Sequence, residues 1–149
     1  MREVGDAQLK DGIALRRAMF GDELVDRNYV HASEFQRPVQ DWLSGAVWSD
    51  VWVRDGMDRR TRSLVTIAML AALNRHDELE MHLTAAAQNG CTAKDIQEVL
   101  LQVAPYCGAP AALSAFRLAE TVLTRTGLLA SAQEPSTEPS TENGVRRAV

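Results

Sequence analysis

The chain has 149 residues, 46% of them hydrophobic, which is enough for one domain with a real core but not for two ordinary domains. Its formal net charge is -4 and its sequence pI is about 5.4. An acidic chain without a basic block is a poor candidate for nucleic-acid binding.

Helical spacing recurs along the chain, whereas no long stretch alternates apolar and polar residues as a strand does. Asp58 is a good N-cap residue, and Thr92 followed by Asp95 resembles a capping box. Asn89-Gly90 is typical of a helix end. In chain order the pattern predicts helices over residues 7–20, 33–47, 58–73, 77–88, 92–105 and 110–124, with an ordered aromatic loop at 48–56.

The composition divides the chain into a helical domain, residues 1–130, and a tail, residues 131–149. The tail contains a tandem Glu-Pro-Ser-Thr repeat and almost no large apolar residues. Such a segment buries too little surface to offset its ordering entropy, so we expect it to be disordered.

The sequence has no signal for a membrane or for an oxidising compartment. Its N-terminus is polar, and its most apolar run, residues 64–73, is too short to span a bilayer. The two cysteines, Cys91 and Cys107, show neither a CxxC nor a metal-binding spacing. We therefore expect a cytoplasmic protein without a membrane segment or a metal site.

The helix over residues 58–73 is apolar nearly all round in its second half, and the last helix is rich in alanine. A small domain cannot easily cover such a helix on every side by itself. Packing against a second copy is the natural solution, so a homo-oligomer is expected.

Glu78 and His82 are the strongest candidates for acid–base chemistry. Their i, i+4 spacing puts a carboxylate and an imidazole on one helix face, where they can share a proton. The same spacing is common on exposed helices, and surface pairs contribute little. His76 and Glu80 form a second pair at this spacing, and spacing alone does not choose between the two.

Three further groups could take part in a site. Arg62 borders the apolar helix and could clamp a carboxylate or hold an oligomer together. Tyr106, at a helix break, could donate a hydrogen bond to an oxyanion or simply fill core space. Trp48 and Trp52 could line a pocket, although an interface is the safer interpretation. The sequence has no phosphate-binding glycine loop, GxSxG elbow or HExxH helix.

Between residues 12 and 123 the chain closely resembles the carboxymuconolactone decarboxylase family, of the wider AhpD-like superfamily. The longest matching stretch is residues 61–75, followed by Asp77-Glu78-Leu79 and His82-Leu83. The resemblance also includes Arg16-Arg17-Ala18, Gly21-Asp22, Trp48-Ser49-Asp50-Val51-Trp52, Ala85-Ala86-Ala87, Asn89-Gly90, Glu98-Val99 and residues 106–112.

The resemblance implies an all-α, AhpD-like fold that assembles into trimers or hexamers. It also implies a small-molecule lactone carboxylate as substrate. The implied reaction is decarboxylation of γ-carboxymuconolactone to β-ketoadipate enol-lactone and CO2, in the protocatechuate branch of aromatic catabolism. The family substrate has a ring double bond that carries electrons into the lactone carbonyl, so no cofactor is implied.

The peroxidase branch of the superfamily has a CxxC ahead of the family histidine. If His82 holds that histidine's place, the two cysteine positions fall at Arg75 and Glu78, and an upstream glutamate of that branch falls at Ser63. Thiol peroxidase chemistry is therefore strongly disfavoured, because it needs a thiolate and a resolving partner.

Under the decarboxylase hypothesis, Arg62 would clamp a carboxylate, and His82 would donate a proton or hydrogen-bond the dienolate. Glu78 would set the tautomer and charge of His82, and Tyr106 would be an oxyanion donor. Two alternatives stay open: a relative acting on another unsaturated lactone or keto acid, and a helical oligomeric binding protein without catalysis.

Overall fold

The computed structural model describes residues 5–130, and within this range the chain is helical without strands. The all-α prediction is therefore confirmed. The predicted disordered tail lies outside the described residues, and the single-domain assignment of residues 1–130 stays a prediction. None of the described helices is long and apolar enough to cross a membrane. The elements are α1 (Asp6–Phe20), α2 (Asp22–Val25), the π-helix η1 (Asp26–Val30), α3 (Arg37–Trp42), the π-helix η2 (Leu43–Trp48), α4 (Arg59–Ala72), α5 (His76–Ala85), the 3-10 helix η3 (Ala87–Asn89), α6 (Ala93–Cys107) and α7 (Ala109–Arg125).

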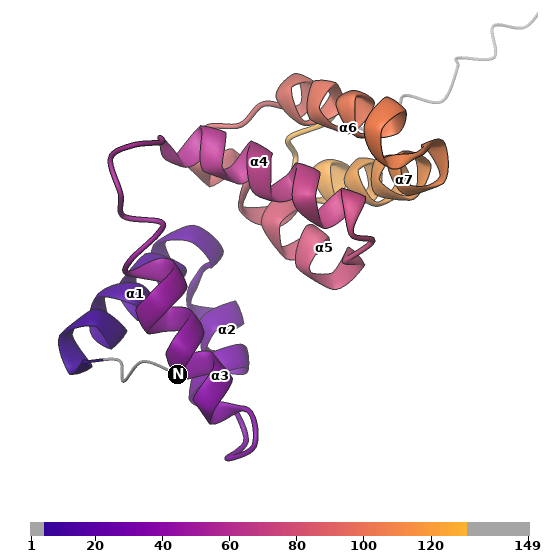
Figure 1. The fold of residues 1–149 in the computed structure, drawn as a ribbon. Coiled ribbons are helices and arrows are strands. Elements are labelled where there is room, and N and C mark those ends of the chain that lie inside the picture. Colours follow the sequence, from indigo (N-terminus) through magenta and orange to yellow (C-terminus); the bar gives the residue numbers. More distant parts are fainter. Residues whose placement is uncertain (1–4, 131–149) are drawn as a thin grey trace, which may run out of the picture.

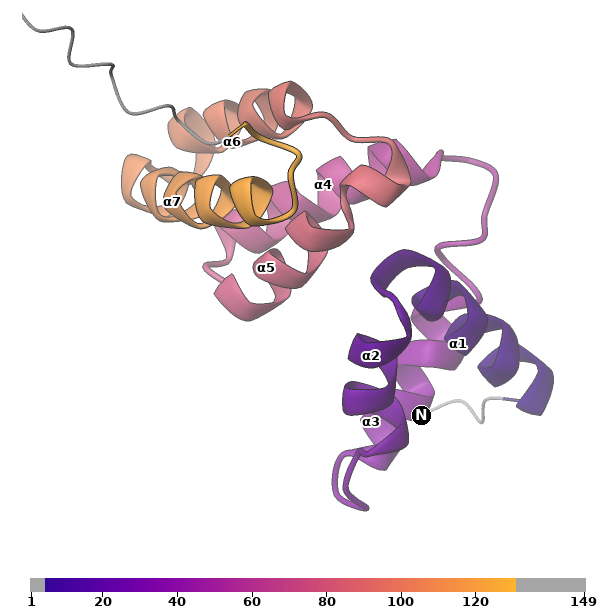
Figure 2. The same ribbon diagram turned by 180° about the vertical axis from the view of Figure 1, so that it is seen from behind.

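The helices form two groups, one from α1 to η2 and one from α4 to α7 (Figure 1 and, from behind, Figure 2). Each group has its own cluster of buried apolar side chains. The larger cluster lies among α4 to α7. The smaller one consists of Leu15, Met19, Trp48 and Trp52. The groups meet where α1 contacts α5.

The predicted caps form as expected. The Asp58 carboxylate accepts a hydrogen bond from the Thr61 backbone N–H at 2.9 Å, which starts α4. Thr92 and Asp95 form a reciprocal capping box at the start of α6. These local interactions explain why the predicted starts of α4 and α6 agree with the structure.

The structure differs from the predicted elements at three places. Residues 22–30, where the pattern predicts no helix, form α2 and η1. The helix expected at 33–47 begins at Arg37, after turns, and its second half is π-helical. Helix α6 continues past Pro105 to Cys107, because a proline in the last turn removes only one backbone hydrogen bond.

A close contact between α1 and η2 brings the first group together. Gly12, Leu15, Arg16 and Met19 are the buried residues of α1 and lie on one face at i, i+3, i+4 and i+7. A Cβ atom at Gly12 would overlap the backbone carbonyl of Ser44 in η2. Only glycine lets the two backbones approach so closely.

The substitution Gly12→Ala is therefore expected to destabilise the fold by about 2 kcal/mol, because the overlapping atoms are backbone and cannot rotate away. Urea unfolding followed by circular dichroism measures this loss. Gly56→Ala is the matched control, since a Cβ atom there meets nothing within 4 Å. An equal free energy of unfolding for the two variants would contradict the close contact between Gly12 and Ser44.

Candidate active site

His82 lies where the two helical groups meet. It sits in the last turn of α5 and is only 7% exposed. Its ring stacks on Trp52 at a centroid distance of 5.9 Å and on Trp48 at 6.2 Å. Phe20 meets it edge-on at 5.5 Å. Phe20 and Trp48 of the first group, with Trp52 from the turn that follows it, therefore enclose the imidazole of the second group.

A cavity of about 430 Å³ adjoins this cluster. Its wall is mostly apolar, with a few polar or charged groups that include Arg16, Glu78 and His82. An apolar pocket with a few convergent polar groups is the usual form of a small-molecule site. The aromatic and aliphatic residues of the wall include Phe20, Leu24, Trp48, Trp52, Met69 and Met81.

Burial determines the charge of His82. Desolvation lowers the pKa of its imidazole from 6.5 to about 4, because the protonated ring would lose its hydration among aromatic neighbours. At neutral pH the ring is therefore uncharged, with one N–H donor and one acceptor nitrogen. A neutral histidine of this kind can donate a hydrogen bond to a developing oxyanion.

Glu78 lines the same cavity but is exposed, and it makes no hydrogen bond to His82 in this structure. Their shared helix face brings both residues to one wall, as the spacing predicts. The second pair is clearly different. His76 is exposed at the start of α5, and Glu80 forms an ion pair with Arg125 at 2.9 Å. The structure therefore separates the two pairs, which spacing alone does not.

Arg62 and Tyr106 do not line this cavity. Arg62 donates a hydrogen bond to the Arg54 carbonyl at 2.9 Å, and its buried Nε has no hydrogen-bond partner among the described residues. Tyr106 is 78% exposed and borders an apolar groove of about 440 Å³ between α4 and α6. The catalytic roles predicted for these two residues stay predictions, because within one chain neither meets His82.

Trp48 and Trp52 are buried, at 6% and 7% exposure, in the cavity wall of their own chain. The pocket interpretation thus describes them better than the interface that the sequence favours. The π-helical turn of η2 ends at Trp48 and widens the helix there; such turns are rare and frequently occur at functional sites.

Arg16 is the site residue that sequence reasoning missed. It lies on the cavity wall at 7% exposure. A signal was available, because Arg16 falls within the i, i+3, i+4, i+7 stripe that α1 buries. A charged residue inside such a stripe indicates either a buried ion pair or a ligand.

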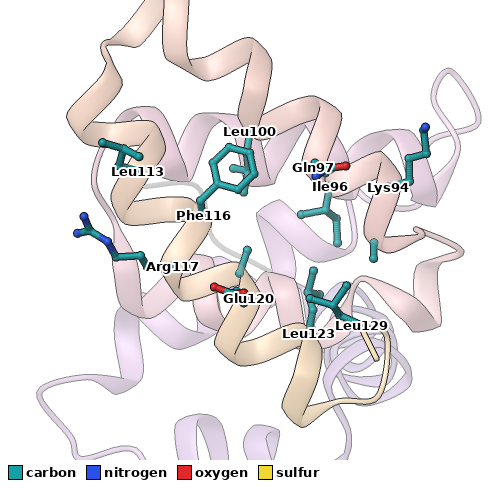
Figure 3. Close-up of a pocket in the computed structure, with 12 residues that line it drawn as sticks. Lys94, Ile96, Gln97, Leu100, Leu113, Phe116, Arg117, Glu120, Leu123 and Leu129 are labelled. Atoms are coloured by element: carbon teal, nitrogen blue, oxygen red, sulfur yellow. The ribbon is translucent and has the colours of Figure 1, made fainter. Parts of the chain in front are cut away.

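A second cavity, of about 490 Å³, lies between α6 and α7. Figure 3 shows Leu100, Phe116 and Leu123 around it, whereas Lys94 and Arg117 extend away from it. Its lining contains no histidine or cysteine, so it offers no buried imidazole comparable to His82. Among the residues that the structure describes, no cluster of three or more His, Cys, Asp or Glu could hold a metal ion.

The lowered pKa of His82 has a consequence for stability. Between pH 6.5 and 4 the unfolded chain binds a proton at His82 that the folded chain does not. The free energy of unfolding is therefore unaffected by His82 above pH 6.5 and decreases as the pH falls from 6.5 towards 4. Going from pH 7 to pH 5 is expected to cost about 2 kcal/mol from this residue. Urea unfolding of wild type and His82→Phe at both pH values isolates it, with His76→Gln as the control. A wild-type loss no larger than that of His82→Phe would show that His82 titrates normally.

Comparison with known proteins identifies the family of the chain. The model of the carboxymuconolactone decarboxylase family matches residues 37–121, more than half of the chain. The chain is 39% identical over 123 residues to 4-carboxymuconolactone decarboxylase of Acinetobacter baylyi, which covers 83% of this chain and 92% of that protein. It is 36% identical over 105 residues to nitrosuccinic acid decarboxylase npaB of Metarhizium robertsii, which covers 70% of this chain and 73% of the relative. The chain belongs to the carboxymuconolactone decarboxylase family.

Proposed function

We propose that the protein catalyses the decarboxylation of 4-carboxymuconolactone to β-ketoadipate enol-lactone and CO2. The similarity to the Acinetobacter baylyi enzyme, which extends over most of both chains, carries this proposal. The buried His82 beside an apolar cavity supplies a site of suitable chemistry. The substrate provides its own electron sink, so the protein needs to supply only binding, charge stabilisation and a proton.

The reaction breaks the bond between the leaving carboxylate and the ring carbon that bears the lactone oxygen. The electron pair moves through the ring double bond to the carbonyl oxygen and forms a dienolate. Neutral His82 donates its N–H to this oxygen, where charge appears only as CO2 leaves. A proton, drawn from solvent, then adds to the ring carbon next to the carbonyl and gives the enol-lactone.

The surroundings of His82 favour this step in a second way. The leaving carboxylate would lie among Trp48, Trp52 and Phe20, where few groups can hydrate it. Loss of CO2 removes that charge from an apolar wall and spreads it into the dienolate. Glu78, on the exposed side of the cavity, is the group that we assign to proton exchange with solvent.

The test is a spectrophotometric assay of the purified, metal-stripped protein on freshly made 4-carboxymuconolactone, with CO2 release followed in parallel. Turnover without added cofactor is expected. His82→Ala is expected to lower kcat at least about 100-fold, the usual range for a lost oxyanion donor. His76→Ala serves as the matched control and keeps wild-type kcat. A near-normal kcat for a folded His82→Ala protein would show that His82 is not the donor to the dienolate oxygen.

A second candidate substrate class follows from the Metarhizium robertsii relative, whose name describes a decarboxylase of nitrosuccinic acid. That acid and 4-carboxymuconolactone share two carboxyl groups and an electron-withdrawing group near the one that leaves. If the folded protein leaves 4-carboxymuconolactone unchanged, a panel of such dicarboxylic acids is the next assay.

A homo-oligomer is also part of the proposal. The groove between α4 and α6 is lined almost entirely by apolar side chains, including Leu64, Val65, Ala68, Val99 and Val103. Val65 is 42% exposed and Met69 is 52% exposed in the single chain. Contiguous exposed apolar surface of this kind usually marks a protein interface, and a second copy that places α4 against this face would cover it.

The substitution Val65→Lys is expected to lower the oligomeric state, because burying an unpaired ammonium in an apolar interface is costly. Sedimentation velocity measures the change. Phe35→Lys is the control, since Phe35 is 94% exposed and lies far along the chain from this groove. A wild-type protein that sediments as a monomer would contradict the interface.

A further inference from the structure

Arg16 is a buried cation without an acidic partner. It is 7% exposed and lines the cavity beside His82. Its guanidinium donates hydrogen bonds to the Ser44 hydroxyl at 2.9 Å and to the Gln40 side-chain oxygen at 3.1 Å. Both partners are neutral. Within residues 5–130, no carboxylate lies at ion-pair distance from it.

The next residue along the helix shows the contrast. Arg17 pairs with Asp22 at 2.7 Å and with Asp26 at 2.5 Å, and it is one-third exposed. The exposed arginine thus has two counter-ions, and the buried one has none. Desolvation accordingly lowers the pKa of Arg16 from its usual value, which reflects the cost of keeping this charge out of water.

A buried charge that is paired only with neutral groups is costly, and such groups are normally paired or bind a ligand. Arg16 also keeps a fixed orientation. Ser44 is fully buried in η2, and Gly12, one turn before Arg16, lets η2 approach closely enough for this contact. The guanidinium is therefore held at the cavity wall before any ligand binds.

We propose that Arg16 is the anion anchor of this cavity and binds the carboxylate that the substrate keeps after CO2 has left. The assignment deepens the proposed function and rests on it, because 4-carboxymuconolactone carries both a leaving carboxylate and an acetate side chain. The planar guanidinium can engage a carboxylate through two parallel N–H groups.

The choice between the two carboxylates follows from transition-state binding. An arginine paired with the leaving carboxylate would stabilise the substrate and lose that interaction as CO2 forms, which would slow the reaction. An arginine paired with the acetate side chain keeps its interaction throughout. Arg16 thus contributes binding and orientation, and the leaving group is left to the aromatic wall of Trp48 and Trp52.

Binding of unreactive probes tests this anchor directly. The first probe is the unsaturated five-membered lactone with the acetate side chain and hydrogen in place of the leaving carboxylate. The second is its neutral acetamide. Quenching of tryptophan fluorescence reports binding, because Trp48 and Trp52 line the cavity. Wild type is expected to bind the acetate at least about tenfold more tightly than the acetamide, as for a charge-assisted hydrogen bond.

The preference should disappear in Arg16→Gln and persist in Arg17→Gln, the matched control on the same helix. If Arg16→Gln does not fold, Arg16→Lys decides the question, because loss of the planar fork should reduce the preference severalfold. A wild type without preference, or a preference unchanged in either Arg16 variant, would overturn the anchor.

Kinetics separate the anchor from the proposed function. In turnover, Arg16→Gln is expected to raise KM for 4-carboxymuconolactone more than it lowers kcat, because the carboxylate it binds is unchanged in the reaction. A mainly structural role would instead lower the fraction of active protein and leave KM unchanged. Absence of turnover by folded wild type would refute the proposed function, while probe binding would still decide the role of Arg16.

Discussion

The close approach of α1 to η2 is the constraint on which the site depends. It requires a residue without a side chain at Gly12, because any Cβ atom there would overlap the Ser44 carbonyl. The same contact places the Ser44 hydroxyl within reach of Arg16 and lets Trp48 pack against Leu15 and its neighbours. The position of Trp48 beside His82 therefore depends on the backbone contact between Gly12 and Ser44, four residues earlier in η2.

Burial gives the two basic groups of the cavity different functions. His82 loses its charge on burial, since an imidazole near neutral pH needs little free energy to release its proton. Arg16 keeps its charge, because a guanidinium does not deprotonate in proteins and its N–H groups are satisfied in part by Ser44 and Gln40. In the proposed reaction the substrate is an anion, and charge develops on its carbonyl oxygen. A neutral hydrogen-bond donor such as His82 and a fixed cation such as Arg16 suit the two charges.

Helix α4 connects the site to the proposed assembly. Met69 lines both the cavity of His82 and the apolar groove between α4 and α6. A second copy on the groove would thus lie next to the cavity, where it could restrict access of water. Tyr106 borders this groove, and Arg62 lies in the first turn of α4; neither lines the cavity of His82 in one chain. Their predicted involvement in the site would depend on such a neighbour.

The sequence alone was sufficient for the helical class, the caps at Asp58 and Thr92, and the shared face of Glu78 and His82, because these follow from interactions within a few residues. Resemblance to the family added the expected reaction. That resemblance also favoured His82 over His76. Only the tertiary structure showed that His82 is buried, since Trp48 and Trp52 stack on it from a distant segment. The tertiary structure also added Arg16 to the site. Its proposed role depends on the contact with Ser44 and on the cavity beside it, and periodicity along one helix reveals neither.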